Sequence, residues 1–257
     1  MPSFLEIATK AVLASGEIQM ARFGRVEKVD YKGEINLVTE VDHQCEAEVV
    51  SILQSEFPSH DILAEEGSGP RKDSDYKWMI DPLDGTTNFA HGYPLFCTSV
   101  ALEYKGEIIA GAVYEPNLKE LFLAEKGGGA TRNGEKISVS TVKELKRALL
   151  GTGFAYNVAQ VKENNLNHFH NFILNAQAVR RDGVAAVDLC YTAMGRFDGF
   201  WELNLFPWDV AAGCLIIKEA GGEVTDFSGR AFSVYSKEIL ASNGALHPSM
   251  IKLLKLS

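Results

Sequence analysis

The sequence predicts a mixed α/β fold, and two patterns along its 257 residues support this prediction. From residue 148 onward, apolar segments of strand length alternate with longer helical segments, which is typical of a layered α/β structure. Before that point, two amphipathic helical segments precede a series of apolar strands joined by short turns. We therefore expect an N-terminal mixed α+β half over residues 1–145 and a C-terminal α/β half over residues 146–257.

The first half is predicted to begin with helices and to continue with strands. Apolar side chains recur at helical spacing from Phe4 to Ala21, and Thr39 is a suitable N-cap for a second helix. Lys105–Gly106 and Asn133–Gly134 are turn signals between strands. The expected elements are a helix over 3–23, an extended pair over 29–38, a helix over 40–57, a strand over 62–64 and several strands between 78 and 125.

The second half is predicted to alternate strands and helices. Its last expected helix has Pro207 at its start and Gly221 at its end, the positions where these two residue types are favoured. The expected elements are a strand over 148–154, a helix over 164–176, a strand over 178–183, a helix over 184–195, a strand over 197–203 and a helix over 207–222.

Composition argues against several classes of protein. The formal net charge of −9 disfavours general binding to nucleic acid, although a small phosphorylated substrate stays compatible with it. No stretch is apolar enough to span a membrane, and Glu6, Lys10 and Glu17 interrupt the apolar run that a secretion signal would need. The four cysteines are widely spaced without a CxxC pair, so we expect reduced, mostly buried thiols in a cytoplasmic protein.

The most informative segment is WMIDPLDGTTNF at residues 78–89. Asp81 ends an apolar, strand-like run, and Pro82 is expected to turn the chain so that Asp84 points back toward Asp81. The N–H groups of Gly85 and Thr86 then begin a helix and favour an anion. Because carboxylates alone would repel a phosphate, the segment predicts divalent cations between the acids and a phosphoryl group. Turn formation and helix capping explain one of the two acids but explain the whole string poorly.

Three further acids are candidates for the same site, each with a simpler alternative. Glu65 follows a short apolar strand, where it either enters a shared cleft or is a solvated loop acid. Asp209 lies in the first turn of an apolar helix, where it either complements the helix dipole or requires a metal ion to offset its burial. Asp42 either joins the site or is a charge on the exposed side of the second helix.

Together these residues resemble the inositol monophosphatase family, part of a wider group of metal-dependent, lithium-sensitive phosphatases. The resemblance implies a layered α/β/α/β/α sandwich, usually assembled as a homodimer, and hydrolase activity that requires Mg²⁺ and is inhibited by Li⁺. It extends over essentially the whole chain and is carried by INLVTEVD at 35–42, ILAEEG at 62–67, WMIDPLDGTTNFAHGYP at 78–94, GVAAVDLCYTAMGRFDGFWE at 183–202, WDVAAG at 208–213 and EAGG at 219–222.

The resemblance also implies two or three Mg²⁺ ions per active site. Glu65, Asp81 and the backbone carbonyl of Leu83 would bind the first ion. Asp81, Asp84 and Asp209 would bind the second, with Asp81 bridging the two. Glu65 would also touch a third, weaker ion.

The mechanism expected on this basis is direct in-line hydrolysis by a metal-activated water. Thr86 would orient that water, and Asp42 would polarise the Thr86 hydroxyl. Asp42, Thr86 and Glu65 are therefore the expected catalytic residues. The N–H groups of Gly85 and Thr86 would hold the phosphate oxygens, and no Cys or His nucleophile is required. His91, the histidine nearest the motif, is interpreted as structural.

The substrate-binding residues implied by the resemblance are Asp84, Glu202 and the segment formed by Gly183, Val184 and Ala185. A cyclic polyol needs acceptors at several angles, and the two oxygens of Glu202 can chelate adjacent hydroxyls. The alternative interpretation is that Glu202 is an exposed acid at the end of a strand and does not bind substrate. Val184 is a departure, because relatives commonly have a small hydroxyl residue there, and the change indicates weaker inositol binding or other substrates.

The leading hypothesis is therefore a Mg²⁺-dependent phosphatase of inositol 1-phosphate. Fructose 1,6-bisphosphatase or broad sugar and polyol phosphatase activity is the alternative, and it requires a basic pocket to which Arg180 and Arg181 would contribute if they face the cleft. Surface charge or a dimer contact is the simpler interpretation of these arginines. Histidinol-phosphate or nucleotide 3′-phosphatase activity, and a fold-retaining interaction protein, are further alternatives.

Overall fold

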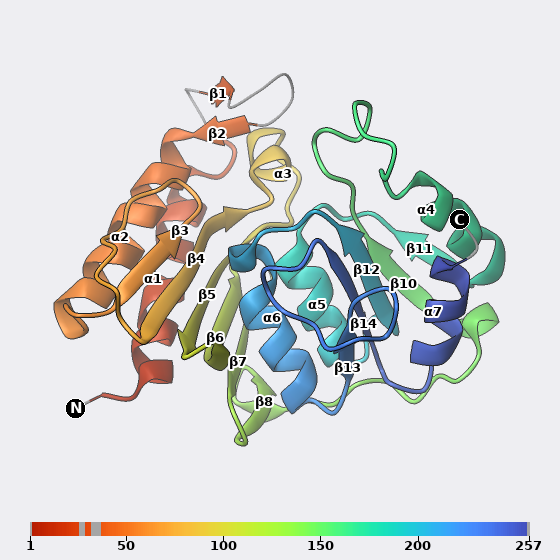
Figure 1. Cartoon of the computed structure of the whole chain (residues 1–257). Coiled ribbons are helices and arrows are strands. Elements are labelled where there is room, and N and C mark those ends of the chain that lie inside the picture. Colours follow the sequence, from red (N-terminus) through yellow and green to blue (C-terminus); the bar gives the residue numbers. More distant parts are fainter. Residues whose placement is uncertain (1, 26–28, 32–36, 256–257) are drawn as a thin grey trace.

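The computed structural model describes residues 2–25, 29–31 and 37–255, and it has the predicted α/β/α/β/α layers (Figure 1). Two helices cover the outer face of the first large sheet, two lie between the sheets, and two cover the far face of the second sheet. The outer pair is α1 (Phe4–Arg22) and α2 (Glu40–Glu56), and the pair between the sheets is α5 (Ala185–Ala193) and α6 (Pro207–Glu219). The pair on the far face is α4 (Leu166–Asn175) and α7 (His247–Leu254). A short helix, α3 (Thr86–Ala90), follows the DPLDG segment.

The first large sheet has its strands in the order β3-β4-β5-β6-β7-β8-β9. They are β3 (Asp61–Ala64), β4 (Tyr76–Asp84), β5 (Cys97–Tyr104), β6 (Glu107–Glu115), β7 (Glu120–Glu125), β8 (Gly129–Arg132) and β9 (Glu135–Lys136). Strands β3 and β4 are parallel, and the other neighbours are antiparallel. The two predicted turns are confirmed, because Lys105–Gly106 joins β5 to β6 and Asn133–Gly134 joins β8 to β9, each with positive φ angles.

The second large sheet has the order β11-β10-β12-β14-β13. Its strands are β10 (Leu149–Thr152), β11 (Ala178–Arg180), β12 (Gly199–Leu203), β13 (Glu223–Thr225) and β14 (Glu238–Ser242). Strand β10 is parallel to β11 and β12, whereas β14 is antiparallel to β12 and β13. Strands β13 and β14 and helix α7 were not predicted, because an apolar run as short as Ile239–Ala241 shows no periodicity.

The start of α2 confirms the predicted cap and decides the position of Asp42. Strands β1 (Val29–Tyr31) and β2 (Leu37–Thr39) pair antiparallel, as expected; the residues between them lie outside the described ranges. Thr39 caps α2, and the Asp42 carboxylate accepts hydrogen bonds from the Thr39 N–H at 2.8 Å and from the Thr39 hydroxyl at 2.6 Å. This capping box turns Asp42 inward, where it is 1% exposed. Its interpretation as an exposed helix charge is therefore wrong.

Each sheet is covered on both faces by apolar side chains. One buried cluster joins α1 and α2 to the first sheet, a second fills the space around α5 and α6, and a third joins α4 and α7 to the second sheet. All four cysteines are free and buried, as predicted. None of the helices in the described ranges is long and apolar enough to cross a membrane. The division into halves at residue 145 stays a prediction.

Candidate active site

Asp81 and Asp84 reach one cavity because β4 contains a β-bulge between them. Asp81 pairs with Ser99 and Asp84 with Cys97, so three steps along β4 match two steps along β5. In a regular strand, residues three apart point to opposite faces, and the extra residue brings both carboxylates to the same face. The turn predicted at Pro82 is therefore wrong in form, because the segment stays within the strand and the bulge redirects the side chains.

Three buried side chains hold the carbonyl of Pro82 within this bulge. The Gln19 amide donates to it at 2.9 Å, and either the Thr98 hydroxyl at 3.0 Å or the Ser15 hydroxyl at 3.3 Å is placed to donate as well, because these two hydroxyls share a hydrogen bond of 2.6 Å. A bulge disrupts the local ladder, and a buried carbonyl left unpaired would cost about 1–3 kcal/mol. Polar residues of α1 and β5 thus stabilise the backbone that carries Asp81.

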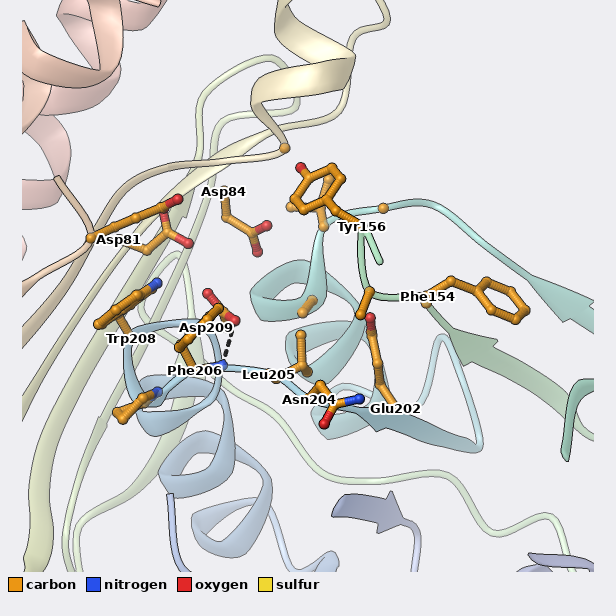
Figure 2. A pocket seen from close by; sticks show the side chains of 18 of the residues that line it. Asp81, Asp84, Phe154, Tyr156, Glu202, Asn204, Leu205, Phe206, Trp208 and Asp209 are labelled. Atoms are coloured by element: carbon orange, nitrogen blue, oxygen red, sulfur yellow. Dashed lines mark hydrogen bonds between the residues drawn. The ribbon is translucent and has the colours of Figure 1, made fainter. Parts of the chain in front are cut away.

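A cavity of about 620 Å³ opens beside these acids. It lies between the first sheet and the ends of α5, α6 and β12, and Figure 2 shows Asp81, Asp84 and Asp209 pointing toward one another in it. All the predicted metal ligands and substrate-binding residues line it: Glu65, Asp81, Leu83, Asp84, Gly85, Thr86, Gly183, Val184, Ala185, Glu202 and Asp209. The structure thus brings together residues that are far apart in the sequence.

Asp42 is the one predicted site residue that does not line the cavity, and it lies behind Thr86. The Thr86 hydroxyl is placed to donate to Asp42 Oδ1 at 2.8 Å or to the Leu83 carbonyl at 3.0 Å. Burial raises the pKa of Asp42 above its ordinary value, while hydrogen bonds from Thr39 and Thr86 oppose that rise. Asp42 can therefore affect the cavity only through the Thr86 hydroxyl.

The acids of the cavity raise one another's pKa. Burial raises the pKa of Asp81 well above its ordinary value, and the charges of Glu65, Asp84 and Asp209 raise it further. Burial likewise raises the pKa of Asp84, as does the charge of Asp209. The pKa of Asp209 is raised to about 7, mainly by burial, although a hydrogen bond from the Phe206 N–H lowers it. Ionising all of them together therefore requires a compensating positive charge.

The residues present fit a magnesium ion by their chemistry. Their donors are all oxygens, which hard cations prefer, and Asp81, Asp84 and Asp209 have no ion pair with a basic side chain among the described residues. Within the same residues, no three His, Cys, Asp or Glu side chains are arranged to hold an ion as they stand. The carboxylates must therefore adjust their side-chain torsions to bind one.

The raised pKa of Asp209 predicts how the metal-free protein responds to pH. Because the folded pKa of about 7 exceeds the ordinary value of 3.8, the stabilising contribution is complete below about pH 4 and is lost as the pH rises through 7. Asp209→Asn removes this loss and still accepts from the Phe206 N–H. In a chelator, we expect the Tm of this variant to exceed that of the parent by more at pH 8 than at pH 5, because the loss in the parent has only begun at pH 5 and is complete above pH 7. An equal difference at both pH values would contradict the assignment.

The opposite wall of the cavity begins at the N-terminus of α5. The Ala186 N–H donates to Asp84 Oδ2 at 2.8 Å, so the positive end of the helix dipole faces this acid. Gly85 has φ +95°, and a Cβ there would meet the Val184 side chain at 2.9 Å. Val184, the departure from the family pattern, is fully buried and packs closely on this glycine.

Glu202 stands at the far end of the cavity from the bulge. It is 7% exposed, so its interpretation as an exposed acid is wrong. Burial raises the pKa of its carboxyl well above the ordinary value, the charges of Asp209 and Asp84 add to this, and Arg181 opposes it. A side chain at Gly153 would collide with both Glu202 oxygens, so this glycine leaves the space that the carboxylate needs.

The structure separates the two arginines. Arg181 lines the cavity, whereas Arg180 does not. The Arg180 guanidinium donates to the carbonyl of Val179 instead. Arg181 is therefore more than a surface charge. His91 is exposed at the end of α3 and does not line the cavity.

Several lining residues were missed by sequence reasoning. Trp208 comes from the first turn of α6, and the others come from the loops after β10 and β12 and before β14: Phe154, Ala155, Tyr156, Asn157, Asn204, Leu205, Phe206, Tyr235, Ser236 and Lys237. Ligands bind outside the carboxyl ends of parallel strands, and β10 and β12 are such a pair. Both strands were predicted from the sequence, so this rule could have identified Phe154 and Asn204 as lining residues. No comparable signal marks Tyr235.

Comparisons with known proteins agree with this geometry. The sequence model described as the inositol monophosphatase family matches residues 1–257. An inositol-1-monophosphatase from Synechocystis sp. is 44% identical over 256 residues, which cover 99% of this chain and 89% of that protein. The Nus factor SuhB of Pseudomonas aeruginosa is 42% identical over 250 residues, which cover 95% and 92% respectively.

The likeness extends to solved structures. An inositol monophosphatase from Anabaena (Nostoc) sp. has a TM-score of 0.90 and 43% identity to this chain. The match covers 98% of this chain and 95% of that one. The chain therefore belongs to the inositol monophosphatase family.

Proposed function

We propose that this protein is a Mg²⁺-dependent phosphomonoesterase that hydrolyses inositol 1-phosphate to inositol and phosphate. The observation that carries the proposal is the meeting of Asp81, Asp84 and Asp209 in one cavity without a basic partner among the described residues. Membership of a phosphatase family supports the same reaction class.

The proposed ligands of Mg²⁺ are Glu65, Asp81, the Leu83 carbonyl, Asp84 and Asp209. When bound, Mg²⁺ activates water and offsets the charge of the phosphate. The protein's own part is to hold these ligands at one face of the bulge in β4 and to present the N–H groups of Gly85 and Thr86 to the phosphate oxygens.

Thr86 positions the attacking water in this proposal. When its hydroxyl proton points to Asp42, the Thr86 oxygen has lone pairs left to accept a hydrogen bond from a water in the cavity. Asp42, buried and held by Thr39, keeps the hydroxyl in that orientation. Water adds to phosphorus while the ester P–O bond breaks, and the leaving alcohol oxygen takes up the proton that the attacking water gives up.

The inositol ring is proposed to lie between Glu202 and the N-terminus of α5. Glu202 accepts hydrogen bonds from neighbouring hydroxyls, and Asp84 and the segment Gly183–Ala185 bound the other side. Val184 provides no hydroxyl to this wall, so other polyol phosphates are expected to compete with inositol 1-phosphate.

The experiment that tests this proposal is a phosphate-release panel with Mg²⁺. It compares kcat/KM for inositol 1-phosphate, fructose 1,6-bisphosphate, histidinol phosphate and 3′,5′-adenosine bisphosphate. We expect inositol 1-phosphate to have the highest value. A higher value for another member of the panel would overturn the substrate assignment, and no release from any of them would overturn the activity.

Fructose 1,6-bisphosphate is the second candidate substrate. Arg181 favours it, because this residue lines the cavity and its guanidinium can bind a second phosphate. Arg181→Gln would then lower kcat/KM for the bisphosphate more than for inositol 1-phosphate.

The bulge support gives a separate prediction for Mg²⁺ binding. Thr98→Val keeps the side-chain volume and removes a donor to the Pro82 carbonyl. We expect it to cost about 1 kcal/mol of stability and to raise the Mg²⁺ concentration for half-maximal activity severalfold. Val12→Ala, on the buried face of α1, is the control for a loss of stability alone. Equal Mg²⁺ requirements in both variants would contradict the role assigned to the bulge.

A homodimer and inhibition by Li⁺ remain predictions from the resemblance, and a cytoplasmic location remains a prediction from the sequence composition. The expectation that the protein does not bind nucleic acid rests on its net charge of −9. Because several relatives are named Nus factor SuhB or putative Nus factor SuhB, binding to nucleic acid is the measurement that would challenge this expectation.

A further inference from the structure

Part of the cavity is lined by aromatic side chains that have no role in the proposed reaction. Phe206, Trp208 and Tyr235 form this part, which we call the aromatic rim, and Lys237 lies on the same wall. Phe206 is 57% exposed and Tyr235 is 53% exposed. Single exposed aromatic residues are ordinary, but these three border one cavity.

Phe206 and Trp208 form a stacked pair of rings close to the acids. Their rings stack with centroids 4.9 Å apart and an interplanar angle of 9°. Phe206 is the N-cap of α6, and its N–H donates to Asp209 Oδ2 at 2.8 Å. Figure 2 shows Trp208 beside Asp81 and the Phe206 N–H bonded to Asp209. The position of this ring pair is therefore fixed relative to a proposed metal ligand.

Tyr235 is held in place by two hydrogen bonds at its hydroxyl. Its hydroxyl donates to Glu103 Oε2 at 2.9 Å and accepts from the Lys77 ammonium at 3.1 Å. These bonds anchor the phenol end of the ring, while about half of the residue remains exposed to the cavity and solvent. A ring fixed before binding loses little conformational entropy when a ligand stacks on it.

Lys237 adds a positive charge to the rim. Its carbonyl accepts from the Asn204 N–H at 2.6 Å, which fixes the backbone at this position. Its ammonium makes no ion pair with the described residues and is exposed. Exposed aromatic rings and a free cation together favour a ring that carries electron-rich or acidic substituents.

We propose that the aromatic rim binds the leaving group of phosphomonoesters whose alcohol carries an aromatic or heteroaromatic ring. The inference rests on the proposed phosphatase reaction and adds a substrate class to it. The phosphate would lie at the carboxylates, and the ring would pack against the exposed side of the Phe206–Trp208 pair. Glu202 remains the contact for polyol hydroxyls, so the two kinds of leaving group use different walls of one cavity.

The test compares the parent with Phe206→Ser, which removes the ring and keeps a favoured N-cap residue at the start of α6. The substrates are 1-naphthyl phosphate, which has a ring, and glycerol 2-phosphate, which has none. We expect the ratio of their kcat/KM values to fall roughly five- to tenfold in the variant, as for a lost ring contact. Tyr93→Ser is the control, because Tyr93 is 52% exposed and lies outside the cavity.

A binding measurement separates failure of this inference from failure of the proposed function. By calorimetry, 1-naphthylmethylphosphonate, which cannot be hydrolysed, is expected to bind the Mg²⁺-loaded parent at least about fivefold more tightly than ethylphosphonate. That preference should disappear in Phe206→Ser and persist in Tyr93→Ser. An unchanged kcat/KM ratio, or equal phosphonate affinities, overturns the aromatic rim. If neither phosphate is hydrolysed, the proposed function fails. The phosphonate affinities alone then decide whether the aromatic rim binds ring-containing ligands.

Discussion

Asp84→Asn is expected to reduce phosphate release by roughly 10³-fold or more while the fold is retained. Asp84 lies in the cavity with Asp81 and Asp209, and the proposal makes it both a ligand of Mg²⁺ and a neighbour of the substrate. Asparagine keeps the size of the side chain. Its amide oxygen can still accept the hydrogen bond from the Ala186 N–H, which in the parent is 2.8 Å from Asp84 Oδ2. The substitution therefore removes a charge without removing a structural contact.

The measurement is Mg²⁺-dependent phosphate release from inositol 1-phosphate, together with a thermal melt in a chelator. The melt should show no loss of stability, because burial and, after it, the charge of Asp209 disfavour ionised Asp84 in the metal-free protein. Asp75→Asn is the matched control, since Asp75 is an exposed acid paired with Lys105 at 3.4 Å and does not line the cavity. Near-normal turnover in Asp84→Asn would overturn the assignment of the metal site.

Thr86→Val is expected to lower kcat by about 10²–10⁴-fold with a much smaller change in KM. The valine side chain fills the same space but offers no lone pair to a water and no hydroxyl to Asp42. Because the lost group acts on the attacking water rather than on the bound substrate, the effect belongs in the chemical step. Steady-state kinetics at saturating Mg²⁺ separates the two constants.

Thr192→Val is the control for the loss of a buried hydroxyl. Thr192 is fully buried, and its hydroxyl donates only to the carbonyl of Asp188 within α5. If Thr86→Val and Thr192→Val lowered kcat equally, Thr86 would have only a structural role. Asp42→Asn should resemble Thr86→Val in direction, because Asp42 reaches the cavity only through that hydroxyl.

The sequence predicted which residues meet but not how the backbone brings them together. Asp81 and Asp84 were placed in one site because their motif is unusual, and both line the cavity. The predicted turn at Pro82 was wrong, because a β-bulge depends on how β4 pairs with β5 and on the side chains of α1 that hold the bulge. Such contacts join residues distant in the sequence, and local propensity contains no information about them.

Burial decided between the alternatives that the sequence left open. Asp42 and Glu202 each had an interpretation as an exposed acid, and both are almost fully buried. Arg180 and Arg181 are adjacent in the sequence, yet only Arg181 lines the cavity. The aromatic rim was missed because Phe206 and Tyr235 come from separate loops, and nothing in either loop alone indicates a shared surface.

Metal dependence tests the central claim most directly, which is that these carboxylates form a Mg²⁺-dependent phosphatase site. The purified protein is treated with a chelator, and phosphate release from inositol 1-phosphate is measured before and after Mg²⁺ is returned. We predict no release above background in the chelator and full recovery with Mg²⁺. Hydrolysis that continues at the same rate without metal would contradict the claim.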